Sequence, residues 1–269
     1  MSLPPSMHEP NSGAARAVAA EPPPGTDRRS APARVAKVRG YLIHVYTAST
    51  LFFVVLAIQW ILEGRYELAL AAMAATLLID ASDGTLARKY RVAETAGRID
   101  GELLDNVVDF ASYVVLPLLF LLHAELLAPP AVAFATVVAL SSAYGFSRTT
   151  AKMSEEGFFV GFPSYWNVVA FYLFVLGLDP WVNTAVVVLL SLLAFTDVKF
   201  LYVSRLKRTR WLHSIGGTAF GVACMIALFV EPGAVRTAAI AVSLLYVVFY
   251  TAHSLVADLA LRRRDAAAR

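Results

Sequence analysis

The sequence has few of the features that mark secreted or thiol-dependent proteins. It holds one cysteine, Cys224, inside an apolar stretch, so no intramolecular disulfide can form and we expect this residue to serve packing. Residues 1–34 contain seven of the 13 prolines and almost no large apolar side chains. They lack the apolar core of a secretion signal, and we predict a disordered tail there. No internal repeat is visible in the remainder.

Apolar residues dominate the rest of the chain. Hydrophobic residues make up 58% of the 269, and the mean hydropathy is +0.62. Soluble domains contain roughly 45–50% apolar residues, and a transmembrane helix needs about 20 of them in succession. We therefore predict an all-α integral membrane protein whose transmembrane domain covers residues 35–262, followed by a basic tail at 263–269. About eight transmembrane segments are expected, at 41–62, 67–88, 101–124, 130–151, 164–178, 180–201, 211–230 and 234–260.

Basic residues are almost absent from every second loop. All but two of the 23 lysines and arginines fall in the N-terminal tail, in the loops after the second, fourth and sixth segments, or at the C-terminus. The exceptions are Arg65 and Arg236. The positive-inside rule then places both termini in the cytoplasm, where these charges attract anionic headgroups. We do not expect a nucleic acid as partner.

Four aspartates interrupt the second and third segments. The stretch LLIDASDGTLARKYR (77–91) contains Asp80 and Asp83, and GELLDNVVDF (101–110) contains Asp105 and Asp109. An acid at the membrane centre costs on the order of 2.5–3.5 kcal/mol. On a helix the first pair shares an arc of about 140° with small residues and a base, and the second pair spans about 80° with a glycine. Two facing acidic surfaces are therefore predicted.

A divalent metal site explains these acids better than salt bridges do. Arg88 and Arg98 would brace the hairpin but cannot neutralise four carboxylates, and the remaining repulsion would raise pKa values. Carboxylate oxygens are hard ligands that suit Mg²⁺, Mn²⁺ or Ca²⁺, and two such ions would balance four charges. Metals at the cytoplasmic end of membrane helices suit phosphoryl chemistry. We predict a metal-dependent enzyme acting on a phosphate or pyrophosphate.

These residues resemble the motif of the CDP-alcohol phosphatidyltransferases, D-x2-D-G-x2-A-R-x8-G-x3-D-x3-D, at every fixed position. One spacing differs, because twelve residues separate Arg88 from Gly101. The longer spacing, the segment GFFVGFPSYWNVVAFY (157–172) and the eight segments resemble the bacterial phosphatidylcholine synthase branch of the family. The resemblance covers roughly residues 38–260.

The resemblance implies transfer of the phosphatidyl group from CDP-diacylglycerol to choline, with release of CMP. It also implies a homodimer in the bacterial inner membrane, with its active site at the cytoplasmic leaflet and two Mn²⁺ or Mg²⁺ ions. By analogy, Asp109 accepts the alcohol proton and Arg88 organises the acids or the pyrophosphate. The implied metal ligands are Asp80, Asp83, Asp105 and Asp109. The implied contacts of the CDP moiety are Gly84, Thr85, Ala87, Arg88 and Gly101.

A quaternary ammonium cannot donate hydrogen bonds and is usually bound by aromatic faces near an acid. The candidates for choline contact are Tyr144, Phe146, Glu155, Glu156, Tyr165 and Trp166. The alternative for these residues is an interfacial aromatic belt with a solvated loop. Arg148 and Lys152 are candidates for binding lipid phosphate, with positive-inside anchoring as the alternative. Asp197 and Asp258 lie near segment ends, where we expect a structural role.

Two other functions are compatible with parts of this pattern. The same enzyme fold can take serine, inositol phosphate or glycerol phosphate as acceptor, but phosphorylated acceptors require a basic pocket. A cation transporter could use the acids as an ion path. Transporters usually show paired broken helices in repeated halves, whereas these acids gather on one hairpin.

Overall fold

The computed structural model describes residues 30–148, 152–153, 157–203, 206 and 209–267. Most of the predicted N-terminal tail lies outside these residues. In chain order the elements are α1 (Ser30–Ala48), α2 (Thr50–Leu62), α3 (Tyr66–Lys89), α4 (Val92–Thr95), α5 (Gly101–Phe110), the π-helix η1 (Ala111–Val115), α6 (Leu116–His123), α7 (Ala131–Ser147), β1 (Lys152–Met153), β2 (Phe158–Val160), α8 (Trp166–Leu176), α9 (Pro180–Leu193), β3 (Lys199–Leu201), α10 (Arg210–Phe229) and α11 (Ala234–Ala267).

The predicted helical membrane fold is confirmed, and each predicted segment contains one helix or one continuous helical stretch. Within the described residues, five helical stretches are long and apolar enough to cross a membrane. Three further apolar helices, α7, α8 and α9, are shorter than 18 residues. Eight full spans are therefore not confirmed. A membrane-spanning helix is typically about 20 residues long, so these three helices are shorter than the usual span.

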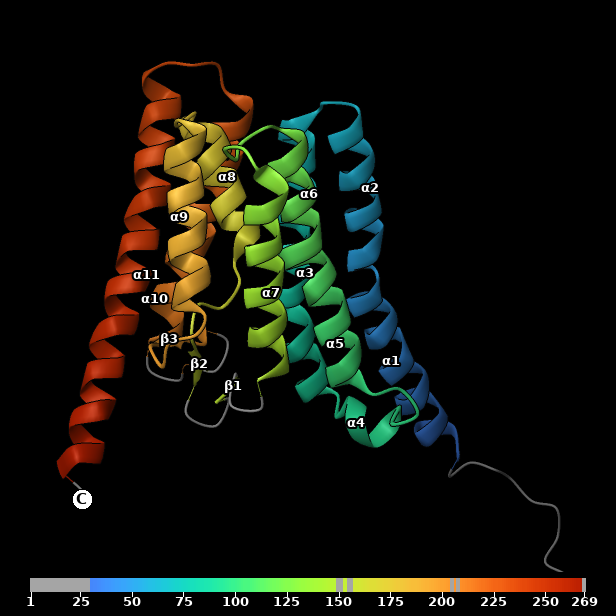
Figure 1. The fold of residues 1–269 in the computed structure, drawn as a ribbon. Coiled ribbons are helices and arrows are strands. Elements are labelled where there is room, and N and C mark those ends of the chain that lie inside the picture. Colours follow the sequence, from blue (N-terminus) through green and yellow to red (C-terminus); the bar gives the residue numbers. More distant parts are fainter. Residues whose placement is uncertain (1–29, 149–151, 154–156, 204–205, 207–208, 268–269) are drawn as a thin grey trace, which may run out of the picture.

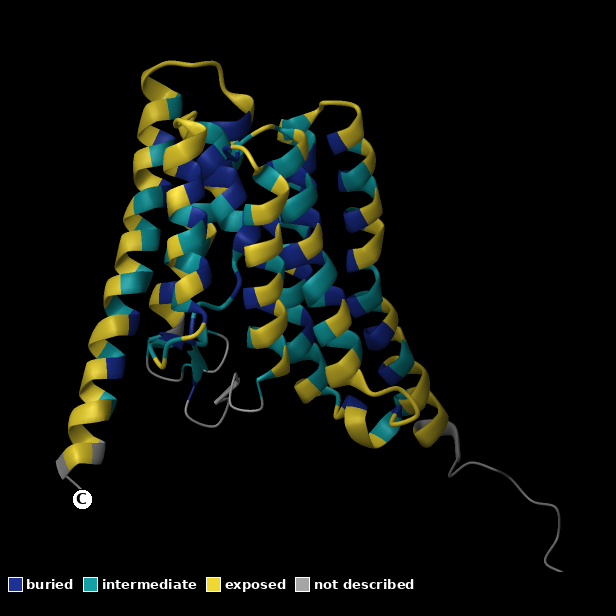
Figure 2. Ribbon diagram, viewed as in Figure 1, coloured by how far each residue is buried: buried dark blue, intermediate teal, exposed yellow. Residues whose placement is uncertain are grey.

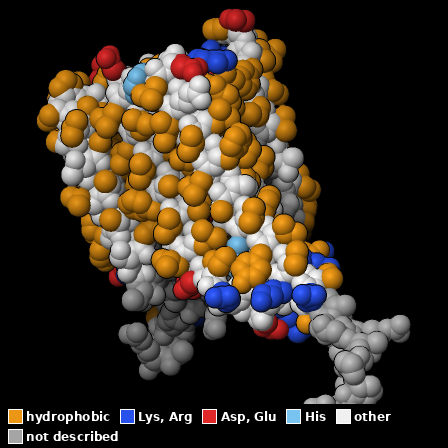
Figure 3. All heavy atoms as spheres, turned by 90° about the vertical axis from the view of Figure 1, so that its right-hand side faces the viewer, with side chains coloured by type: hydrophobic (Ala, Val, Ile, Leu, Met, Phe, Trp, Pro, Cys, Tyr) orange, Lys and Arg blue, Asp and Glu red, His pale blue; other side chains and the backbone are white. Residues whose placement is uncertain are grey.

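The helices pack side by side in a bundle, and the two ends of the described chain lie at the same end of it (Figure 1). The connections after α3, α7 and α9 also reach this end, which we call the basic end because the predicted cytoplasmic lysines and arginines belong to these segments. Figure 3 shows an apolar band around one face, with lysines and arginines gathered below it and a smaller charged group above it. This distribution is typical of a membrane protein.

The core lies between the helices, while their outer faces are exposed and apolar (Figure 2). Ile61, Met73 and Phe120 are fully buried, whereas Leu78, Val132 and Leu245 on outward faces are each about 70% exposed. In water such a surface would be costly, at roughly 25 cal/mol per Å² of apolar area. A bilayer removes this cost, so the exposed apolar surface supports the membrane assignment.

Three short strands at the basic end were not predicted. They form an antiparallel sheet in the order β1–β2–β3, with Phe158 paired to Leu201. The sheet requires α9 to end at Leu193, earlier than the predicted boundary at 201. Gly161 makes this junction possible, because its φ is +82° and an added Cβ would lie 2.5 Å from the Ala194 carbonyl oxygen.

Two predicted boundaries also shift outward. Helix α1 begins at Ser30 rather than near residue 35, and α11 continues to Ala267 through most of the predicted basic tail. Alanine, arginine and lysine are good helix formers, and a proline such as Pro32 is tolerated in the first turn of a helix. Local helix propensity therefore extends both terminal helices past the apolar segments.

Candidate active site

Two helices supply the acids at the basic end. Asp80 and Asp83 lie on α3, where Asp80 is half-buried and Asp83 is buried. Helix α5 begins after Asp100, whose Oδ1 accepts hydrogen bonds from the backbone nitrogens of Glu102 and Leu103 at 3.1 and 3.0 Å. This cap satisfies otherwise unpaired N–H groups of the first turn. It fixes the start of the helix, and therefore the direction in which Asp105 and Asp109 point.

The structure brings three of the four predicted acids together. Asp80, Asp105 and Asp109 each offer a carboxylate oxygen, and these oxygens lie within 4.8 Å of one another. All three residues are half-buried. Three converging hard oxygen donors fit a divalent cation such as Mg²⁺ or Mn²⁺. The buried Asp83 falls outside this group, so its assignment as a metal ligand remains a prediction.

Tyr113 adjoins the acid cluster, although the sequence did not identify it as a site residue. It lies in η1, is only 5% exposed, and donates a hydrogen bond from Oη to Asp80 Oδ2 at 2.6 Å. One signal was available, because Gly101, Asp105, Asp109 and Tyr113 are spaced by four residues throughout. Residues with this spacing share a helical face. The apolar neighbours of Tyr113 had suggested only a membrane segment.

The two motif glycines have side-chain neighbours on the protein itself. A Cβ added to Gly101 would lie 3.0 Å from Cε1 of His44 on α1, and one added to Gly84 would lie 3.2 Å from Nη1 of Arg88. His44 is 8% exposed, and its Nε2 has no hydrogen-bond partner among the described residues. The missing side chain of Gly101 therefore permits the close approach of His44. Its predicted contact with the CDP moiety stays a prediction.

The other predicted CDP contacts lie along the end of α3. Arg88 is exposed and donates from Nη2 to Thr85 Oγ1 at 3.3 Å, so this guanidinium folds back along its own helix. Ala87 packs against a small buried cluster formed by Ile43, Val92 and Ala96. Ala87 therefore helps to join α1, α3 and α4, a packing role that the sequence did not indicate.

The aromatic candidates for choline separate into different environments. The Tyr165 ring lies 6.2 Å from the Tyr113 ring and 6.4 Å from that of Tyr250, next to the acid cluster. Trp166 instead is 0% exposed and donates from Nε1 to Ser142 Oγ at 2.8 Å. Its ring belongs to the hydrophobic core, so no face is open to a ligand in this conformation.

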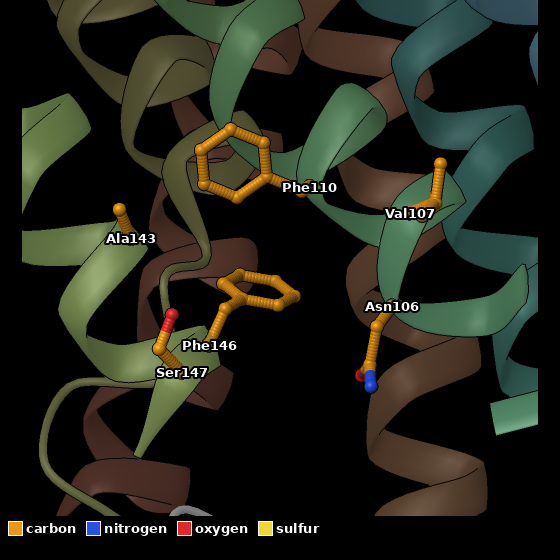
Figure 4. A pocket seen from close by; sticks show the side chains of 6 residues that line it. All are labelled: Asn106, Val107, Phe110, Ala143, Phe146 and Ser147. Atoms are coloured by element: carbon orange, nitrogen blue, oxygen red, sulfur yellow. The ribbon is translucent and has the colours of Figure 1, made fainter. Parts of the chain in front are cut away.

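Tyr144 and Phe146 lie on α7. The exposed Tyr144 packs on Phe195 at 4.8 Å between ring centroids. Phe146 packs edge-on against Phe110 at 5.5 Å and lines a shallow groove beside α5 (Figure 4). The groove is lined by Asn106, Val107, Phe110, Ala143, Phe146 and Ser147. Glu155 and Glu156 lie outside the described residues.

Arg148 is held by the protein rather than open to a lipid phosphate. Its Nη2 donates to Asp197 Oδ1, and its Nη1 donates to the Thr196 carbonyl oxygen at 3.3 Å. The hydrogen bond and charge of Arg148 lower the pKa of the Asp197 carboxyl below its ordinary value. Asp258 forms a second ion pair with Arg262 at 2.9 Å. Both aspartates thus take the structural role expected of them. Lys152, the other candidate for binding lipid phosphate, lies in β1, and its role stays a prediction.

A comparison with known families agrees with this geometry. Residues 44–193 match the sequence profile of the CDP-alcohol phosphatidyltransferases, and this stretch contains the acid cluster and both motif glycines. The chain belongs to the CDP-alcohol phosphatidyltransferase family.

Several relatives in this family carry the name phosphatidylcholine synthase. The protein of that name from Pseudomonas aeruginosa is 38% identical over 181 residues, covering 65% of this chain and 73% of its own length. The one from Legionella pneumophila is 40% identical over 168 residues, covering 62% and 66%. The one from Borreliella burgdorferi is 36% identical over 174 residues, covering 64% and 74%.

Proposed function

We propose that this phosphatidyltransferase is a phosphatidylcholine synthase, which transfers the phosphatidyl group of CDP-diacylglycerol to choline and releases CMP. The observation that carries the proposal is the cluster of Asp80, Asp105 and Asp109 at the basic end of an apolar bundle. Relatives named phosphatidylcholine synthase, 34–41% identical to the chain, support the choice of acceptor.

In this reaction the choline oxygen forms a bond to the phosphorus that carries diacylglycerol. The bond from that phosphorus to the bridging pyrophosphate oxygen breaks, and CMP leaves with the electron pair. Divalent cations, proposed as two Mn²⁺ or Mg²⁺ ions, would neutralise the pyrophosphate and the developing charge on CMP. The proposed ligands are the three clustered carboxylates together with Asp83 on the same helix as Asp80.

The chain's own residues would supply the proton transfer and the orientation of the substrates. Asp109 is proposed to accept the choline hydroxyl proton as general base. Arg88 is exposed on α3 two turns beyond Asp80, where its charge would attract the pyrophosphate. His44 and Gly101 lie in contact at the start of α5, and we place the nucleotide beside them with Gly84, Thr85 and Ala87.

Tyr165 is the proposed contact for the trimethylammonium group. Its ring lies beside Tyr113, which binds Asp80, so a cation held on this ring is close to the acid cluster. A cation–π contact contributes roughly 0.5–2 kcal/mol. We further propose that the chain lies in a bacterial inner membrane as a homodimer, with both termini and the basic end in the cytoplasm, as the distribution of lysine and arginine favours.

The test is an acceptor panel with the purified full-length protein in lipid bilayers. CDP-diacylglycerol and Mn²⁺ or Mg²⁺ are supplied with labelled choline, serine, inositol phosphate or glycerol phosphate, and lipid products and CMP are measured. Choline should be preferred, and a chelator should abolish product. Preference for another alcohol would refute choline as the acceptor but would leave the transferase assignment intact. Ion flux without any CMP release would favour the transporter alternative.

A further inference from the structure

The hydroxyl of Tyr113 joins the two structural elements that supply the acid cluster. Asp80 belongs to α3, whereas Asp105, Asp109 and Tyr113 belong to the continuous stretch of α5 and η1. The 2.6 Å bond from Tyr113 Oη to Asp80 Oδ2 therefore crosses between them. A length of about 2.5–2.7 Å is typical of a hydroxyl bound to a charged carboxylate. The bond ties the acid of one helix to the helix that bears the other two.

This bond also restricts the rotation of the Asp80 carboxylate. The terminal torsion of an aspartate is broad, with no strongly preferred angle. Each carboxylate oxygen has two lone pairs, so Asp80 retains acceptor capacity after binding Tyr113. Carboxylate oxygens of Asp80, Asp105 and Asp109 lie within 4.8 Å of one another, so the rotation of the Asp80 carboxylate affects how they converge. Tyr113 is 5% exposed and provides a buried donor that limits this rotation.

Tyr113 lies in a wide helical turn that begins two residues after Asp109. Residues Ala111–Val115 form a π-helix between two α-helical stretches. Such turns are rare and occur often at functional sites, since they alter the direction of the side chains they carry. The turn that carries Tyr113 therefore sets the position of its hydroxyl relative to the acids.

We infer that Tyr113 is a positioning residue of the metal site: its hydroxyl orients Asp80 so that the three carboxylates bind a divalent cation together. This inference rests on the proposed function. Tyr113 acts through Asp80, so its effect should appear first in metal affinity. Groups that donate hydrogen bonds to metal ligands typically contribute 10- to 100-fold in metal affinity or activity.

The test compares two variants that each lose one buried phenol hydroxyl. Tyr113→Phe removes the bond to Asp80, and Tyr172→Phe removes the 2.9 Å bond to Ser243 in the core between α8 and α11. Mn²⁺ binding to the purified chain in nanodiscs, without substrate, is measured by electron paramagnetic resonance. We expect about 10-fold or greater weakening in Tyr113→Phe and no change in Tyr172→Phe.

Two further measurements separate positioning from general packing. Saturating Mn²⁺ should restore much of the turnover of Tyr113→Phe, which a packing defect would not allow. In an Asp80→Asn background, Tyr113→Phe should cause no additional loss of Mn²⁺ affinity. Native affinity in Tyr113→Phe, equal weakening in both phenylalanine variants, or turnover that does not respond to added Mn²⁺ would each overturn the inference. Failure of the native chain to bind Mn²⁺ would instead overturn the proposed metal site.

Discussion

Replacing Trp166 should reduce stability without changing choline recognition. This residue is fully buried in the core, packs against Phe162 at 5.0 Å and donates a hydrogen bond to Ser142. Tyr165 precedes it directly but lies beside Tyr113 near the acids. The two neighbours thus have separable roles, and the same substitution in each tests the assignment.

The magnitude for Trp166→Leu follows from volume and hydrogen bonding. Truncating a buried tryptophan to alanine costs about 3–5 kcal/mol, and leucine keeps part of that volume. Leaving Ser142 Oγ without its donor adds about 1 kcal/mol. We therefore expect a loss of roughly 3 kcal/mol, which lowers the unfolding midpoint of a chain of this size by about 6–12 °C. Choline KM should stay within twofold of native.

The assay measures thermal unfolding and choline KM for both leucine variants in the same lipid. Tyr165→Leu should raise choline KM roughly 2- to 30-fold, the equivalent of one cation–π contact, with CDP-diacylglycerol KM nearly unchanged. The reasoning fails for Trp166 if Trp166→Leu keeps native stability and raises choline KM. It fails for Tyr165 if Tyr165→Leu leaves choline KM unaltered.

Three other predictions concern the acids, a helix start and an ion pair. Asparagine at each of the three clustered aspartates should cut turnover at least about 10²-fold with folding retained, and near-native turnover in two of them would refute the metal site. Gly101→Ala should displace His44 and raise CDP-diacylglycerol KM about fivefold, at a cost on the order of 1 kcal/mol, while Gly221→Ala, where a Cβ meets open space, should not. Because the folded-state pKa of Asp197 is lowered by Arg148, their ion pair contributes stability above about pH 4 and loses it as pH falls through that lowered pKa. Asp197→Asn should therefore lower the unfolding temperature at pH 7, and this deficit should shrink progressively as the pH falls below about 4. A deficit that does not shrink at acidic pH would contradict the assignment.

Much of the site was predictable because its determinants are local. Hydropathy requires a membrane bundle, and an acid is too costly in such a segment to lie there without compensation. The spacing of Asp105 and Asp109 puts both on one face of any α-helix, whatever that helix packs against. The structure confirms their convergence with Asp80. Tyr113 continues the same spacing, but its partner on another helix is not encoded in local sequence.

Packing between distant segments decided what the sequence left open. The four motif acids appear equivalent in the sequence, yet the rotation of α3 against α5 brings Asp80 to the cluster and leaves Asp83 outside it. The close approach of His44 to Gly101 depends on where α1 crosses the start of α5.

The adjacent residues Tyr165 and Trp166 show the same division. The sequence predicted both as aromatic side chains beside a cytoplasmic loop, but Trp166 is fully buried in the core. Successive residues at the start of a helix point about 100° apart, so one ring lies by the acids and the next enters the core. The order of apolar and charged residues thus determined the membrane bundle and the acidic face of α5. Tertiary packing determined which side chains meet that face, because contacts between helices depend on their mutual rotation and not on the spacing within either one.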